Sequence, residues 1–242
     1  MEPTMMPTMM PGLAPTVAAA GRTIMPGGGI ARRPLHVIIM ADCSGSMMHG
    51  GKIQALNFAI AEMLQQFAEW ERTQASCQVL IRAIAFSATP EWHVPEPLPV
   101  GHVRWTPLQA VPKGRTNMAP AFRLAASVLT SDKLERRAFN PVLLLITDGM
   151  PTDPDDIDGA LAELMSLRAG RDAMRLAVAI GQDAKSGTLT RFIADPAVPV
   201  LLASNVSDIA DQLKLATLMV TRPGYAADLD ESEPADETDV VV

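Results

Sequence analysis

The most constraining feature of the sequence is an almost unbroken apolar run, residues 35–41, that ends at Asp42 and is followed by Ser44 and Ser46. Strands that are buried on both faces have such continuous runs, as in a parallel sheet covered by helices on both sides. In sheets of that kind, ligands bind where the strands end at the carboxyl edge. The sequence therefore predicts one carboxylate and two hydroxyls together on a loop at that edge.

Further apolar runs alternate with segments of helical periodicity along the chain. This alternation predicts an α/β fold: a doubly wound, mostly parallel sheet flanked by helices. Residues 91–94 are expected to form one short antiparallel edge strand, because Pro90 and Pro95 confine pairing there. The proline-rich residues 95–114 are interpreted as a surface loop. The other expected strands are 77–86, 141–147, 174–180 and 198–202, and the expected helices are 53–70, 119–129, 155–167, 189–194 and 206–219.

Composition divides the chain into three parts. Residues 1–34 are rich in Met, Pro and Gly and lack any regular pattern, so a disordered leader is predicted. Residues 35–222 form the expected folded domain. Residues 223–242 are an acidic tail that is expected to be disordered and solvated. Seven of the 27 acidic residues lie in 226–242, where there is no Lys or Arg, which leaves 20 acids against 20 Lys and Arg in residues 1–225.

The neutral body argues against nucleic acid as a partner, because such binding needs clustered basic side chains. No stretch is apolar over the length of a membrane span, and the start of the chain lacks the pattern of a secretion signal. A cytoplasmic location is therefore expected, with no membrane partner. Cys43 and Cys77 are expected to be buried apolar fillers, since two cysteines cannot build a zinc site alone and their places at a strand end and a strand start suit a disulfide poorly.

Two further polar positions are expected to join the Asp42 loop. Thr116 lies just before an expected helix, and Asp148 follows the apolar run 141–146. In a doubly wound sheet these three loops can converge on one edge. Carboxylate and hydroxyl oxygens are hard ligands that suit Mg²⁺ or Mn²⁺ rather than zinc or copper. The alternative is a purely structural role, in which the serines only hydrogen-bond to backbone groups of the turn and Asp148-Gly149 is an ordinary turn.

Taken together, these residues resemble the von Willebrand factor A family and its metal-ion-dependent adhesion site. The D-x-S-x-S motif matches Asp42, Ser44 and Ser46, the distant threonine matches Thr116, and the aspartate of the T-D-G motif matches Asp148. The segment 147–153 resembles the bacterial TerY-like branch, which is associated with tellurium resistance and stress signalling. The resemblance implies a metal that captures a carboxylate of a partner protein, and an assembly that includes a kinase and a phosphatase.

Two other functions are weighed against this metal-dependent adaptor. One is a metal-free scaffold with the same fold. The other is a metal-dependent phosphotransferase or hydrolase, which is disfavoured because Ser44 stands where a second carboxylate is needed and no Gly-rich phosphate loop is present. We therefore expect a protein that is not an enzyme. The acids at 153, 155, 156 and 158 are interpreted as helix capping, because they lack the Gly and Glu of a calcium loop.

Overall fold

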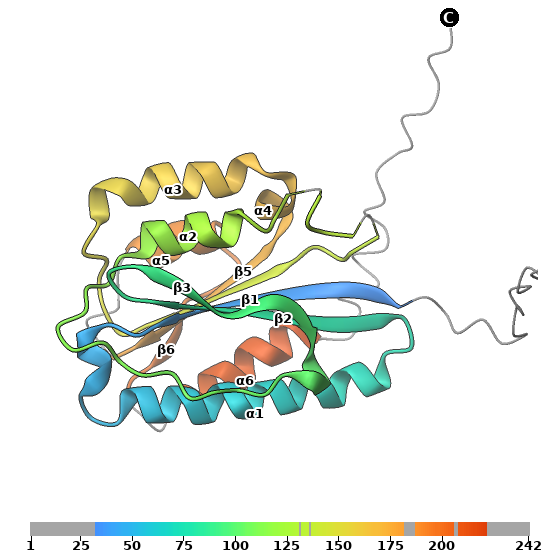
Figure 1. Ribbon diagram of the computed structural model, residues 1–242, viewed down its shortest axis with the longest axis horizontal. Coiled ribbons are helices and arrows are strands. Elements are labelled where there is room, and N and C mark those ends of the chain that lie inside the picture. Colours follow the sequence, from blue (N-terminus) through green and yellow to red (C-terminus); the bar gives the residue numbers. More distant parts are fainter. Residues whose placement is uncertain (1–31, 131, 136, 182–186, 206–207, 222–242) are drawn as a thin grey trace, which may run out of the picture.

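The computed structural model describes residues 32–130, 132–135, 137–181, 187–205 and 208–221. The predicted leader, apart from residues 32–34, and the acidic tail lie outside these residues. The described part contains a six-stranded sheet in the order β3-β2-β1-β4-β5-β6 (Figure 1). All neighbouring strands are parallel except β2 and β3, which are antiparallel. The strands are β1 (Arg33–Asp42), β2 (Cys77–Phe86), β3 (Pro90–Pro99), β4 (Val142–Thr147), β5 (Met174–Ile180) and β6 (Leu201–Ala203).

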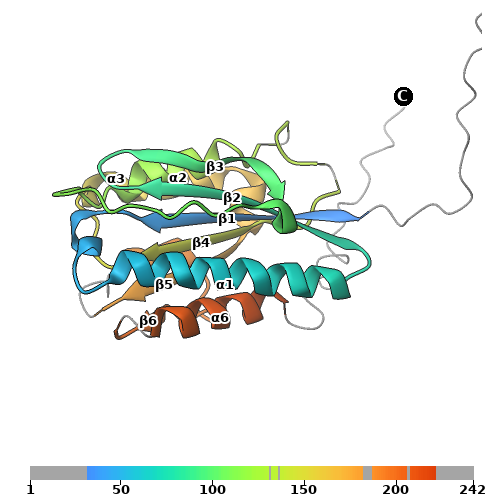
Figure 2. The same ribbon diagram turned by 60° about the horizontal axis from the view of Figure 1, so that its bottom comes forward.

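Helices cover both faces of this sheet. On one face α1 and α6 lie side by side, and on the other face lie α2, α3 and α5 (Figures 1 and 2). The α/β, doubly wound arrangement predicted from the alternation of apolar runs is therefore confirmed. The helices are α1 (Lys52–Thr73), α2 (Met118–Ala126), α3 (Pro154–Ser166), α4 (Arg168–Asp172), α5 (Gly187–Ile193) and α6 (Asp208–Thr221), with short 3-10 turns η1 (Gly45–Met48) and η2 (Val100–His102).

The central strand β1 is buried on both faces, as its continuous apolar run predicts. Val37 and Ile39 point into the core under α1 and α6, whereas Ile38 and Met40 point into the core under α2, α3 and α5. Each of these four side chains is at most 1% exposed. Burial from both sides fixes the register of β1 and hence the position at which it delivers Asp42 to the carboxyl edge.

The edge strand β3 is longer than the sequence pattern suggested. The expected strand 91–94 extends to Pro99, so residues 95–99 belong to the sheet rather than to a surface loop. Prolines at 95, 97 and 99 are tolerated because an edge strand has one side without a partner strand, and alternate residues direct their backbone groups to that side. The pairing with β2 has register shifts between Ile81 and Ile84, which accommodate these residues.

Two other expectations need correction at the far end of the sheet. The last strand, expected at 198–202, is the shorter segment Leu201–Ala203, because Pro199 interrupts pairing and the Val198 amide instead bonds Asp195 in a turn. A short helix, α4, follows α3 directly and was not expected. Neither difference changes the carboxyl ends of β1 and β4.

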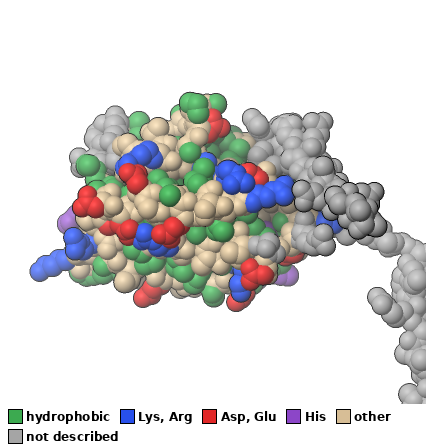
Figure 3. Space-filling model, turned by 90° about the horizontal axis from the view of Figure 1, so that it is seen from above, with side chains coloured by type: hydrophobic (Ala, Val, Ile, Leu, Met, Phe, Trp, Pro, Cys, Tyr) green, Lys and Arg blue, Asp and Glu red, His purple; other side chains and the backbone are tan. Residues whose placement is uncertain are grey.

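Two properties of the described part concern its helices and the face over α2 and α3. None of its helices combines the length and apolar character needed to cross a bilayer. On the face over α2 and α3, basic and acidic side chains are interspersed (Figure 3).

Candidate functional site

The site is built at the carboxyl end of β1, where Asp42 is fully buried. Its Oδ1 accepts a 2.7 Å hydrogen bond from the Ser44 amide, and its Oδ2 accepts a 2.6 Å bond from the Thr147 hydroxyl at the end of β4. Burial raises the pKa of Asp42 to about 6, against the opposing effect of these hydrogen bonds. The carboxyl group is thus held rigidly between two adjacent strands.

A chain of short hydrogen bonds links the remaining groups of the first loop to Asp148. The Ser44 and Ser46 hydroxyl oxygens lie 3.0 Å apart, and the Ser46 hydroxyl donates to Asp148 Oδ1 at 2.6 Å. Ser44 and Asp148 are buried, whereas Ser46 is exposed at the rim. The loops after β1 and β4 therefore meet, as predicted for neighbouring parallel strands.

Thr116 joins the same edge from the loop before α2. Its backbone pairs with Thr152: the Thr116 amide donates to the Thr152 hydroxyl at 3.1 Å, and the Thr152 amide donates to the Thr116 carbonyl at 2.9 Å. The Thr116 hydroxyl lies 3.5 Å from the point where a Cβ on Gly149 would stand. The hydroxyl of Thr116 thus borders the Asp148-Gly149 turn.

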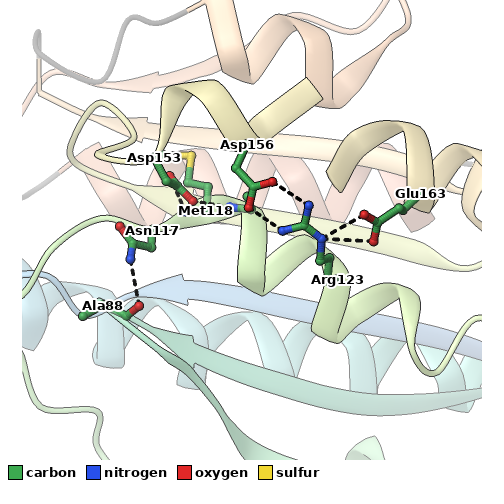
Figure 4. A network of polar contacts seen from close by, with 8 residues as sticks. Ala88, Asn117, Met118, Arg123, Asp153, Asp156 and Glu163 are labelled. Atoms are coloured by element: carbon green, nitrogen blue, oxygen red, sulfur yellow. Dashed lines mark hydrogen bonds and ion pairs between the residues drawn. The ribbon is translucent and has the colours of Figure 1, made fainter. Parts of the chain in front are cut away.

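Asp153 attaches the start of α2 to the loop after β4. Its two carboxylate oxygens accept the Met118 and Ala119 amides at 3.0 and 2.8 Å (Figure 4). Asp153 is the N-cap residue of α3, as the capping interpretation expects, but its side chain makes no hydrogen bond to that helix. Its carboxylate instead satisfies the free amides of a different helix, which positions Thr116 two residues earlier.

A second backbone connection supports the first loop from the other side. The Gly45 amide donates to the Gly114 carbonyl at 3.0 Å, and the Val111 amide donates to the Cys43 carbonyl at 2.7 Å. A Cβ on Gly45 would stand only 3.1 Å from the Lys113 nitrogen. A side chain at position 45 would therefore push the 42–46 and 111–116 loops apart by a few tenths of an ångström, and Gly45 favours their close approach.

Lys52, the first residue of α1, contributes a contact that sequence reasoning did not anticipate. Its Nζ donates to Asp148 Oδ2 at 2.6 Å. The Asp148 side chain is fully buried, and the Lys52 side chain is 27% exposed. Gly50 and Gly51 both have positive φ, which lets the chain turn sharply before Lys52.

The oxygens at this edge suit a hard divalent cation. Neighbouring ligands of an octahedral ion with bonds of 2.0–2.1 Å lie about 2.9 Å apart. The separations of 3.0 Å between the serine hydroxyls and 2.6 Å between Ser46 and Asp148 are close to that value. The described residues hold no cluster of three or more His, Cys, Asp or Glu side chains, so any metal here would depend on the hydroxyls.

All five residues chosen from sequence, Asp42, Ser44, Ser46, Thr116 and Asp148, lie at this one edge of the sheet. Sequence reasoning missed four residues that fix their geometry: Lys52, Thr147, Thr152 and Asp153. Thr147 could have been found from its place as the last residue of β4 beside Asp42. The roles of Lys52 and Asp153 carry no such signal, because both act on segments distant in sequence.

Other sequence expectations have definite outcomes. Cys43 and Cys77 are free and buried, as expected. His36, in β1, is buried and contacts Glu135 Oε2 through Nε2 at 2.6 Å. His49, three residues after Ser46, and Arg115, directly before Thr116, are exposed.

Comparison with known proteins identifies the architecture. Residues 37–150 match the family model of the von Willebrand factor type A domain. No curated protein matches the sequence. Similar solved structures include a von Willebrand factor type A protein from Catenulispora acidiphila, with a TM-score of 0.59 and 17% identity over 76% of this chain and 42% of that chain.

Two further structures have the same fold. Proximal thread matrix protein 1 of the mussel byssus, described with a zinc-occupied MIDAS motif, has a TM-score of 0.60 and 15% identity over 79% of this chain and 49% of its own. The ArnB paralog VWA2 from Sulfolobus acidocaldarius has a TM-score of 0.54 and 16% identity over 76% and 45%. The chain spans less than half the length of these three structures. The likeness shows that the described domain has the von Willebrand factor type A fold.

Proposed function

Starting from this von Willebrand factor type A fold, we propose that the protein is a metal-dependent protein-binding module. Asp42, Ser44, Ser46, Thr116 and Asp148 would hold Mg²⁺ or Mn²⁺, and the ion would take an Asp or Glu carboxylate of a partner protein. The observation that carries this proposal is the unbroken set of contacts from Asp42 through Ser44 and Ser46 to Asp148. It joins oxygen donors from two loops at the edge where α/β folds bind ligands.

The balance of charge among the donors favours an anionic partner. Two carboxylates can balance a divalent ion, while the three hydroxyls are neutral. When bound, such an ion supplies an open coordination position that attracts an anionic oxygen. Lys113 and Arg115 are exposed on the adjoining loop and add positive charge to the rim. An acidic side chain of a partner is therefore better matched to this edge than a basic one.

Exposed apolar side chains on the same loops support a protein as the partner. Met48, Val111 and Met150 are 50%, 47% and 63% exposed. Met48 follows Ser46, Val111 precedes Thr116, and Met150 follows Asp148, so each of the three loops of the proposed metal site carries one of them. Exposed apolar groups around a polar centre are typical of protein interaction sites.

The biological setting is proposed from the resemblance of residues 147–153 to the TerY-like branch. We place the protein in the cytoplasm as an adaptor in a stress-response or tellurium-resistance-like assembly that includes a kinase and a phosphatase. An enzymatic role is not favoured, because Ser44 stands where a phosphotransferase needs a second carboxylate and the sequence has no Gly-rich phosphate loop. Lys52, which lies beside the site, is ion-paired with Asp148.

One observation favours the metal-free scaffold as the second candidate. The Lys52 ammonium already contacts Asp148, so the carboxylate has a counter-ion without any metal. A calorimetric Mg²⁺ titration separates the two candidates. The adaptor predicts one saturable site that is lost in Asp148→Ala, whereas the scaffold predicts no binding to either protein.

Partner binding is tested by affinity capture from native lysate in Mg²⁺ and in excess EDTA. The same captured protein should be lost in EDTA and in Ser46→Ala, a substitution at an exposed position that is expected to leave the fold intact. Asp155→Ala, in an exposed acid outside the site, is the matched control and should retain capture. Capture that is unchanged by chelator and by Ser46→Ala would contradict the proposal.

A further inference from the structure

Lys52 occupies a position that helix electrostatics do not favour. It is the first residue of α1, and the first turn of that helix contains no acidic residue. The N-terminal end of a helix carries partial positive charge, which disfavours a lysine there. The ion pair with Asp148 at 2.6 Å offsets this cost. The placement of Lys52 is thus explained by the carboxylate it contacts rather than by the helix it begins.

The Asp148 carboxylate is held in place, whereas the Lys52 ammonium sits at the end of a flexible side chain. Asp148 directly follows β4, its side chain is fully buried, and its other oxygen accepts the Ser46 hydroxyl. Lys52 reaches it through four flexible methylene groups and is 27% exposed, so its ammonium has a route to water. If a cation enters beside Asp148, the lysine is therefore the group that moves.

We propose that Lys52 is a tethered cation that competes with the divalent ion for Asp148 and so sets the metal affinity of the site. This inference rests on the proposed function, since it concerns the same metal site. A bound ion and the Lys52 ammonium repel each other when both contact one carboxylate. Metal binding should therefore release Lys52 to solvent, and loss of metal should return it to Asp148.

The first experiment measures Mg²⁺ affinity by calorimetry on the full chain. Lys52→Met removes the charge but keeps an unbranched side chain, and it should tighten Mg²⁺ binding roughly tenfold. Lys52→Arg keeps the charge and should bind Mg²⁺ about as the wild type does. Lys113→Met is the matched control, because it removes a nearby exposed lysine that makes no contact with Asp148. Its effect on affinity should be much smaller.

The second experiment uses the unaltered protein and does not depend on a variant folding. Brief treatment with an amine-acetylating reagent, followed by mass spectrometry, reports the accessibility of each lysine. Lys52 should be protected in EDTA and modified several-fold faster in saturating Mg²⁺. Lys113 and Lys214 are exposed and serve as internal references whose rates should not change.

The outcomes separate this inference from the proposed function. Mg²⁺ binding that is lost in Asp148→Ala but equal in wild type, Lys52→Met and Lys113→Met overturns the role of Lys52 and leaves the metal site standing. Acetylation of Lys52 at one rate with and without Mg²⁺ overturns it as well. Absence of Mg²⁺ binding in every protein overturns both.

Discussion

The Ser46 hydroxyl donates a 2.6 Å hydrogen bond to Asp148 Oδ1, although 102 residues separate the two in sequence. The contact is possible because β1 and β4 are neighbouring parallel strands, with Ala41 paired to Ile146. Both strands therefore end at the same height in the sheet, and the polar residues that follow them meet. The geometry of the site is a direct consequence of the strand order.

The role of Asp153 can be tested through stability. Asp153→Ala leaves the Met118 and Ala119 amides without their acceptor, which should lower the free energy of unfolding by about 1–3 kcal/mol. Urea denaturation measures the change. Asp155→Ala removes a neighbouring acid in the first turn of α3 and should cost less than about 1 kcal/mol. Equal losses in the two variants would show that Asp153 acts only through its own helix.

Thr147 should hold Asp42 in place through its hydroxyl. Thr147→Val keeps the side-chain shape but removes the donor to Asp42 Oδ2, and should lower the free energy of unfolding by about 1–3 kcal/mol. The pKa of Asp42, already raised to about 6, should rise further because the lost bond favoured the carboxylate. NMR titration of the Asp42 side chain in EDTA checks the direction. A fall in the pKa of Asp42 would contradict this assignment.

The buried His36 makes stability depend on pH with a defined sign. Burial is the main cause that lowers the pKa of His36 below its ordinary value of 6.5, assisted by Arg82 and opposed by the contact with Glu135. The unfolded chain then binds more protons than the native protein as the pH falls below about 6.5, so His36 lowers the free energy of unfolding on acidification. Well above pH 6.5, His36 is neutral in both states and does not change the free energy of unfolding.

The measurement is urea denaturation of wild type and His36→Gln between pH 8 and pH 5. Because Asp42 has a raised pKa, it acts with the opposite sign over part of this range, so the difference between the two proteins is the informative quantity. Wild type should lose more stability than His36→Gln as the pH falls. Parallel curves would mean that His36 does not titrate differently in the folded protein.

Both cysteines should be inert in the native protein. Burial raises the pKa of Cys43 and of Cys77 to about 12, and the two residues are 4% and 0% exposed. A thiolate is the reactive form, so reaction with Ellman's reagent at pH 8 should be slow without denaturant and complete for two thiols in denaturant. Rapid labelling of the native protein would place at least one thiol at the surface.

Much of the fold follows from residue patterns that act locally. The apolar run before Asp42 and the one before Asp148 each predicted a strand buried on both faces, and β1 and β4 are such strands. The α1 helix is evident from its apolar spacing. The length of β3 was underestimated, because prolines usually end strands and only its place at the edge of the sheet makes them acceptable.

The site likewise contains residues that could be found from local sequence patterns and residues that could not. The five oxygen-bearing residues could be chosen because each stands beside a recognisable strand or helix boundary. Asp153 and Lys52 could not, because their partners at 118–119 and 148 are set by how the loops fold over the edge. Whether the five residues bind a metal is a matter of coordination chemistry, which their positions support and a measurement must decide.

That measurement is the anomalous diffraction of crystals of the full chain grown with Mn²⁺. The proposed function predicts one strong peak at the carboxyl edge, about 2.0–2.6 Å from oxygens of residues such as Ser46 and Thr116. It also predicts that the peak disappears in Asp148→Ala. Saturating Mn²⁺ with no peak at this edge, and with Lys52 still against Asp148, would contradict the account.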